Sequence, residues 1–151
     1  MSPERKVQLD EVLLSIAENI ATMSLATKAK VGAIIYKDDN IISMGWNGMP
    51  SGFPNEEIEK IDASGAKITN SLVLHAESNS ILKGAASNGN VKGSVLYCSF
   101  SPCPDCAKLI IQAGIKKVIY RNDYRIIEGV HILRRAGIEV VKLKPKLKYE
   151  I

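Results

Sequence analysis

The stretch SVLYCSFSPCPDCAKLIIQAGIKKVIY, residues 94–120, contains two short apolar runs on either side of a run with helical periodicity. We expect strands over Ser94–Phe100 and Lys117–Arg121, because short runs rich in β-branched residues favour strands. We expect a helix over Asp105–Ala113, where apolar residues recur at three- and four-residue intervals. Gly114 follows that run, as a helix C-terminal cap requires. Strand, helix and strand in this order predict parallel neighbours in one sheet.

The alternation of helix and strand continues on both sides of this stretch. A helix is expected from about His75 to Ala86, and a helix over Ile126–Arg135 precedes a strand over Glu139–Leu143. Further upstream, VGAIIYK (31–37) and IISMGWN (41–47) flank the turn formers Lys-Asp-Asp-Asn, which predicts an antiparallel hairpin.

The N-terminal part adds a helix and an irregular segment. Apolar residues between Val7 and Thr27 recur at helical intervals and predict an amphipathic helix. The segment from Gly48 to Asn70 is rich in Pro, Gly and charge, so it is the least regular part and a candidate binding loop. These elements predict one α/β domain over residues 1–151, with a sheet of five strands and helices on its faces.

Composition and charge exclude several classes of protein. The chain has 151 residues, 46% of them hydrophobic, which suits one compact domain. The net charge is +4, the aromatic content is 5%, and Lys142, Lys144, Lys146 and Lys148 are expected in a solvated strand edge and tail. A stable nucleic-acid partner is therefore not expected. No apolar run of about 18 residues occurs and the N-terminal MSPERKVQLDE is polar, so we expect a cytoplasmic protein with no membrane partner.

The cysteines point to a metal or to redox chemistry. Their number is odd, and Cys103 and Cys106 form a Cys-x-x-Cys pair, which a disulfide framework explains poorly. His75 and this pair both lie at predicted helix N-termini, where free N–H groups and the positive end of the helix dipole favour thiolates. A catalytic zinc site needs three protein ligands and a fourth position for water. His75, Cys103 and Cys106 supply that number.

Glu77 lies two residues after His75, so its side chain can reach a metal-bound water rather than the metal. Zinc lowers the pKa of bound water from 15.7 to roughly 7. Glu77 is then the expected proton shuttle to a ring nitrogen and a departing amine. The order His75, Glu77, Pro102, Cys103, Cys106 is the pattern of zinc-dependent nucleobase deaminases.

The cysteine pair has two other interpretations. A redox pair on a thioredoxin-like fold would not need His75 or Glu77. A structural zinc site would normally need a fourth protein ligand, for which Cys98, His131 and acidic residues are the candidates. Cys98 is expected to be a small buried thiol in its strand, and His131 to be a packing or surface residue of its helix. Neither is taken as a ligand.

From Val31 to about Leu143 the chain resembles the deoxycytidylate (dCMP) deaminase family of the cytidine deaminase-like superfamily. The matching segments are VGAIIYKDDNIISMGWNGMPSGFPN, LHAESNSIL, LYCSFSPCPDCAKLIIQAGIKKVIY and GVHILRRAGIEVVKL. The loop from Gly45 to Gly52 is the most family-specific piece, and Trp46 stands there where tyrosine is usual. The resemblance implies a three-layer α/β/α fold with a five-stranded mixed sheet and helices on both faces.

The resemblance also implies an activity and its residues. The activity is the zinc-dependent conversion of dCMP to dUMP, the precursor of thymidylate, with release of ammonia. The family's three zinc ligands carry over to His75, Cys103 and Cys106, and its proton donor to Glu77. The substrate contacts carry over to Asn47, Ala76 and Tyr124.

Regulation and assembly are implied by the same resemblance. Many members are hexamers, activated by dCTP and inhibited by dTTP, each bound with Mg²⁺. Candidates for the regulatory nucleotide site are Lys28, Lys30, Asn47, Gly48 and Gly52. Some members bind a second, structural zinc in the segment that follows the hairpin, but residues 48–70 contain no cysteine or histidine. One zinc per chain is therefore predicted.

Two alternative functions stay open at this point. A tRNA adenosine deaminase or a free-base or nucleoside deaminase would share the His-x-Glu and Pro-Cys-x-x-Cys motifs, and only the loop Gly45–Gly52 and the segment IIQAGIKKVIY speak against it. A non-catalytic, zinc-stabilised nucleotide-binding module is the third possibility, against which the presence of Glu77 argues.

Overall fold

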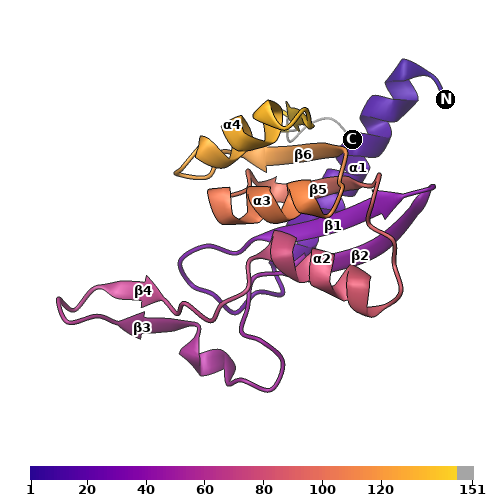
Figure 1. Cartoon of the computed structure of the whole chain (residues 1–151). Coiled ribbons are helices and arrows are strands. Elements are labelled where there is room, and N and C mark those ends of the chain that lie inside the picture. The colour runs from indigo at the N-terminus through magenta and orange to yellow at the C-terminus, as the bar shows by residue number, and fades with distance from the viewer. Residues whose placement is uncertain (146–151) are drawn as a thin grey trace.

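A five-stranded mixed sheet organises the computed structural model, which describes residues 1–145 (Figure 1). The strand order is β2-β1-β5-β6-β7. β1 is antiparallel to β2 and to β5, while β5, β6 and β7 run parallel, as predicted. The elements are α1 Pro3–Ala21, β1 Gly32–Lys37, β2 Asn40–Trp46, a 3₁₀ turn Asn55–Glu57, β3 Glu59–Ile61, β4 Lys67–Thr69, α2 Ala76–Ala86, β5 Val95–Phe100, α3 Pro104–Gln112, β6 Lys117–Asn122, α4 Glu128–Arg135 and β7 Glu139–Lys142.

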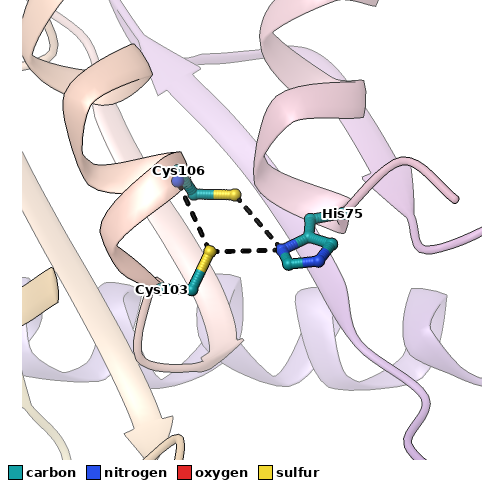
Figure 2. Close-up of side chains that lie close together, drawn as sticks. All are labelled: His75, Cys103 and Cys106. Carbon is teal, nitrogen blue, oxygen red and sulfur yellow. Dashed lines mark hydrogen bonds between the residues drawn. The ribbon is translucent and has the colours of Figure 1, made fainter. Parts of the chain in front are cut away.

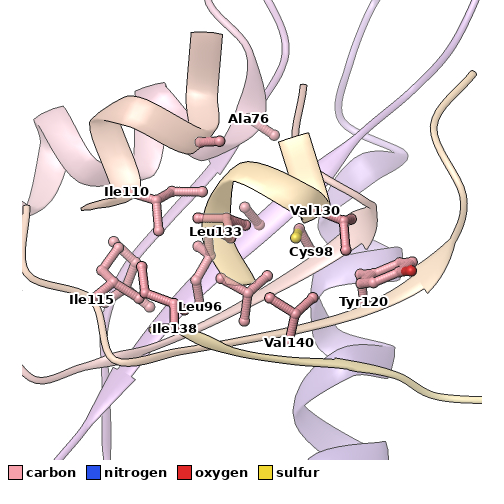
Figure 3. Packing of buried hydrophobic residues seen from close by; sticks show 14 residues of the cluster. Ala76, Leu96, Cys98, Ile110, Ile115, Tyr120, Val130, Leu133, Ile138 and Val140 are labelled. Atoms are coloured by element: carbon pink, nitrogen blue, oxygen red, sulfur yellow. The ribbon is translucent and has the colours of Figure 1, made fainter. Parts of the chain in front are cut away.

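Helices cover both faces of this sheet and make three layers. Successive strand residues point to opposite faces, so Ile34 packs under α1 with Leu14 and Ala17, while Ala33 and Ile35 belong to the core on the opposite face. That second core lies under α2, α3 and α4 and includes Ala76, Ile110 and Leu133 (Figure 3). The predicted three-layer α/β/α fold is confirmed.

The first helix differs from its prediction at both ends. It begins at Pro3, where the Ser2 hydroxyl accepts a hydrogen bond from the Arg5 N–H at 3.2 Å. It ends at Ala21 rather than Thr27, so the predicted helix over 22–27 is wrong. The Thr22 hydroxyl donates to the Asn19 carbonyl, and the Ser24 hydroxyl donates to the Asn47 carbonyl at 2.8 Å. These bonds turn the chain into a loop that leads to β1.

The segment after β2 is more ordered than its sequence indicates. Residues 59–61 and 67–69 pair as the antiparallel strands β3 and β4, and Figure 1 shows this hairpin as an arm that projects from the body of the domain. Strands of three residues with mixed polarity carry almost no periodicity signal. The predicted hairpin of β1 and β2 is confirmed, and Asp38 and Asp39 both adopt positive φ in its two-residue turn.

The predicted lysine-rich edge is seen in part. Lys142 and Lys144 are exposed, and Lys142 forms an ion pair of 2.6 Å with Asp123. Lys146 and Lys148 lie outside the described residues. Among residues 1–145, no helix combines the length and apolar composition needed to cross a bilayer.

A buried arginine ties α1 to the sheet. Arg121, at the end of β6, is 5% exposed and donates to Glu11 at 2.9 Å and to Glu18 at 3.1 Å. It also donates to the Lys144 carbonyl at 2.6 Å. Two carboxylates about two turns apart on α1 therefore depend on one guanidinium that has little contact with water.

We predict that Arg121→Met lowers the free energy of unfolding by about 3 kcal/mol, because removing one partner of a buried ion pair leaves its counter-charges unpaired. Urea denaturation would measure this loss. Lys108→Met is the control, since Lys108 and its partner Asp105 are both exposed, and its effect should stay within about 0.5 kcal/mol. Equal effects of the two substitutions would contradict the assigned role of Arg121.

Candidate active site

The N-termini of two helices converge to form the site. His75 is the N-cap residue of α2 and Cys103 that of α3, while Cys106 lies in the first turn of α3. Leu74 positions His75 by exchanging two backbone hydrogen bonds with Gly48, of 2.8 and 3.1 Å. The Cys106 N–H donates to the Cys103 sulfur at 3.4 Å, which satisfies one of the free donors of the helix end.

The three side chains point at one another (Figure 2). The His75 Nδ1 lies 3.3 Å from the Cys103 Sγ and 3.4 Å from the Cys106 Sγ. All three ligand atoms fall within 4.8 Å of one another. Zn–N and Zn–S bonds of ordinary length at a tetrahedral angle put the nitrogen and sulfur about 3.5 Å apart. One imidazole and two thiol donors at this spacing fit a zinc ion with a position left open.

The electrostatics of the cluster favour a thiolate. A hydrogen bond from the Cys106 thiol lowers the pKa of Cys103 to about 4, and the same bond raises the pKa of Cys106. The hydrogen bond to Cys103 raises the pKa of His75. A thiolate is the form of cysteine that binds metals, so the cluster already stabilises one of the anionic ligands that zinc requires.

Glu77 lies in the first turn of α2, two residues after His75, and is 4% exposed. Burial raises its pKa above the usual range of a carboxyl group, and a hydrogen bond with Cys106 acts in the opposite direction. A carboxyl group with a raised pKa can both accept and donate a proton near neutral pH.

A cavity of about 250 Å³ opens beside the cluster. It brings together seven residues that the sequence predicted for catalysis, metal binding, substrate binding or regulation: Lys28, Asn47, His75, Ala76, Glu77, Cys103 and Tyr124. Cys106 does not line the cavity but belongs to the same group of potential metal donors as His75 and Cys103. Lys30, Gly48 and Gly52 do not line the cavity. Lys30 and Gly52 are exposed, and Gly52 adopts a positive φ of 89° in its turn.

Asn47 holds a wall of this cavity through its side chain. Its amide oxygen accepts from the Val31 N–H and its amide nitrogen donates to the Ala29 carbonyl, both at 2.8 Å. An amide group offers two donors and two lone pairs. One donor and one lone pair of Asn47 are left for a ligand.

Two cavity residues near Tyr124 were not predicted from the sequence. The Ser101 hydroxyl accepts from the Tyr124 N–H at 2.7 Å, and the Arg125 guanidinium lies 5.8 Å from the centre of the Tyr124 ring. Among the residues that line the cavity, Lys28 and Arg125 carry the positively charged lysine and arginine side chains. The neighbouring Tyr124 was the one signal in the sequence that could have pointed to Arg125.

Cys98 and His131, which were not predicted to be metal ligands, lie outside the group of metal donors. Cys98 is 0% exposed within the core, where burial raises its pKa well above the usual value, and its predicted burial is confirmed. His131 is exposed on α4. Among residues 1–145, the group of metal donors contains neither.

Comparisons with known proteins agree with this geometry. A family model described as the cytidine and deoxycytidylate deaminase zinc-binding region matches residues 7–122. The deoxycytidylate deaminase of Enterobacteria phage T2 is 32% identical over 91% of this chain and 93% of its own length. That of Mus musculus is 35% identical over 90% and 80%. A crystal structure of dCMP deaminase from cyanophage S-TIM5 in complex with dCMP and dUMP is 46% identical, with a TM-score of 0.81, and the match covers 95% of this chain and 99% of that one.

We predict that the purified chain contains one zinc ion and that Cys106→Ser loses most of it, because a hydroxyl is a poor substitute for a thiolate ligand. Metal analysis of the purified variants would measure the zinc content. Cys98→Ala is the matched control, since Cys98 is also a buried cysteine but lies outside the cluster. Full zinc content in Cys106→Ser, or its loss in Cys98→Ala, would contradict the assignment.

Proposed function

The chain belongs to the cytidine and deoxycytidylate deaminase family, and we propose that it hydrolyses dCMP to dUMP with release of ammonia. The supporting observation is that one cavity combines the His75 and Cys103 donors and the buried Glu77 with two cations, Lys28 and Arg125. The dCMP deaminase of cyanophage S-TIM5, similar over nearly its whole length, was crystallised with dCMP and dUMP.

We propose His75, Cys103 and Cys106 as the ligands of a single catalytic zinc. When bound, zinc supplies the Lewis acidity that makes water a nucleophile at neutral pH. The ligands lie at helix N-termini, and the rigid helices fix their spacing. The open side of the cluster faces the cavity, since His75 and Cys103 both line it.

Glu77 is proposed to carry the protons of the reaction. It accepts one proton from the attacking water and donates it to N3 of the cytosine ring. It then takes the second proton from the hydroxyl newly formed at C4 and passes it to the amino group, which leaves C4 as ammonia. The balance is dCMP and water on one side and dUMP and ammonia on the other. The raised pKa of Glu77 suits this exchange, because an acid–base group works best when its pKa lies near the working pH.

Lys28 and Arg125 are proposed to bind the 5′-phosphate. They reach the cavity from separate segments, Lys28 from the loop before β1 and Arg125 from the loop after β6. Cations on two walls can neutralise a phosphate dianion, and an arginine can bind it with two parallel hydrogen bonds. A free base carries no such group, and a non-catalytic module has no need of a buried Glu77. These two alternatives therefore explain fewer of the residues.

Regulation by dCTP and dTTP, a role for Mg²⁺ and a hexamer stay predictions from the resemblance. The pairing of Gly48 with Leu74 supports a link between the loop Asn47–Gly52 and the site, since Leu74 directly precedes His75. Lys28 lines the cavity, whereas Lys30 does not, so Lys28 suits the substrate as well as a regulator. A cytoplasmic location also stays a prediction.

We predict that the purified chain converts dCMP to dUMP and that Glu77→Gln lowers the turnover number at least about 10²-fold, because the amide cannot exchange the proton. Turnover is measured as ammonia release and the zinc content is measured on the same sample. The zinc content should not change, since Glu77 is not a ligand. An unchanged turnover number would exclude the proton-transfer role.

We predict that Lys28→Ala raises the KM for dCMP about tenfold, because a hydrogen bond to a charged group contributes on the order of 1.5 kcal/mol. The turnover number should change much less. Lys60→Ala removes an exposed lysine of β3 that does not line the cavity, and its KM should match that of the unmodified protein. The same KM in both variants would argue against a phosphate contact at Lys28.

A further inference from the structure

An irregular loop forms one wall of the cavity. Residues 22–31 join α1 to β1 without helix or strand, and Ala26, Lys28, Ala29 and Val31 of this loop line the cavity. A loop without its own backbone hydrogen-bond ladder depends on side chains of other segments for its shape. The anchors of the loop therefore decide where Lys28 lies.

The C-terminal half of the loop is held by Asn47, the residue that directly follows β2. Asn47 bonds to the backbone of both Ala29 and Val31. Ser24, near the start of the loop, donates to the Asn47 carbonyl and accepts from the Ala26 N–H at 3.2 Å. None of these four hydrogen bonds involves Thr27 or Lys28.

The middle of the loop is held by the β3–β4 arm. One carboxylate oxygen of Glu59 accepts from the Thr27 N–H at 2.6 Å and the Lys28 N–H at 3.1 Å, and lies 3.2 Å from the Thr27 hydroxyl. From β4, the Lys67 ammonium donates to the Thr27 hydroxyl at 3.0 Å. The hydrogen bond from the Thr27 N–H also lowers the pKa of Glu59, so the carboxylate is charged at neutral pH.

The base of the same arm is part of the cavity. Ile58, which precedes β3 and is 2% exposed, and Thr69 of β4 both line it. Glu59 therefore acts next to the site, from an element that Figure 1 shows projecting from the domain.

We propose that Glu59 is a positioning residue for substrate recognition, which holds the backbone of Thr27 and Lys28 so that the Lys28 side chain faces the cavity. The inference rests on the proposed function, because it takes Lys28 as a contact of the substrate phosphate. Within residues 1–145, the hydrogen bonds of Glu59 go to Thr27 and Lys28, and Glu59 does not line the cavity.

The first test compares three substitutions of Glu59. Glu59→Ala removes the acceptor and should raise the KM for dCMP about tenfold, since a displacement of about 1 Å in a binding group can cost this much or more. The dissociation constant for dUMP, measured by calorimetry, should rise by a similar factor while the turnover number changes less than about twofold. Glu59→Asp shortens the side chain and so moves the carboxylate away from the Thr27 and Lys28 N–H groups. Its KM should therefore rise as it does in Glu59→Ala. Glu59→Gln keeps one oxygen acceptor in place and should restore a KM close to that of the unmodified protein.

Asp62 provides a matched control on the same arm. Its carboxylate oxygen accepts from the Ser64 N–H at 2.9 Å, the Ser64 hydroxyl at 2.6 Å and the Ala66 N–H at 2.9 Å, all within the turn between β3 and β4. Asp62→Ala thus removes a carboxylate with as many contacts but none to the loop 22–31. It should leave both the KM for dCMP and the dissociation constant for dUMP unchanged.

A double-mutant cycle tests whether Glu59 acts through Lys28. If it does, Glu59→Ala combined with Lys28→Ala should weaken dUMP binding no more than Lys28→Ala alone. If the double variant instead weakens dUMP binding by the product of the two single effects, the proposal is overturned. It is also overturned if Glu59→Ala leaves the KM for dCMP and the dissociation constant for dUMP unchanged, as expected for Asp62→Ala. Circular dichroism checks that each variant is folded, and Glu59→Asp replaces Glu59→Ala if the latter is not. An unmodified protein that neither binds dUMP nor consumes dCMP would instead refute the proposed function.

Discussion

The close approach of two helix N-termini is the constraint on which the site depends. The His75 Nδ1 and the Cys103 Sγ lie 3.3 Å apart because α2 and α3 begin at the same edge of the sheet. The packing around both helix starts is very tight. A Cβ on Gly129 of α4 would lie 2.0 Å from the Pro102 carbonyl oxygen, and one on Gly45 of β2 would lie 2.9 Å from the Ala76 carbonyl oxygen. The start of each helix is thus packed closely against a neighbouring element that has no side chain at the contact.

The proposed catalytic residues and the proposed binding residues lie on different kinds of structure. The metal donors and Glu77 lie on helix starts that are anchored in the core, which suits groups whose spacing must be rigid. The cations lie on the loops 22–31 and 123–127, which hydrogen bonds from other segments hold in place. Loops on a rigid scaffold commonly carry binding residues, because they can change without disturbing the fold. In this cavity the metal donors and Glu77 are therefore fixed by the core, whereas the cationic side chains lie on loops that can change without disturbing the fold.

Much of the fold and part of the site could be predicted from the sequence, for identifiable reasons. Regular periodicity located the central strands and helices. The residue types and the spacing of His75, Cys103 and Cys106 located the group of potential metal donors. The end of α1 was misplaced because apolar residues continue past Ala21, where side-chain bonds turn the chain. Arg125 and Glu59 were missed because their roles come from contacts between distant segments. Glu59 meets Thr27 across 32 positions of sequence, and no local pattern records such a contact.

The most direct test of the account is a substrate panel with the zinc-loaded protein. Ammonia release would be measured with dCMP, deoxycytidine, cytosine and tRNA at equal concentrations. We predict the highest catalytic efficiency with dCMP, because only this substrate offers both the cytosine ring to Glu77 and a 5′-monophosphate to Lys28 and Arg125. Deamination of tRNA or cytosine with no activity on dCMP would contradict it.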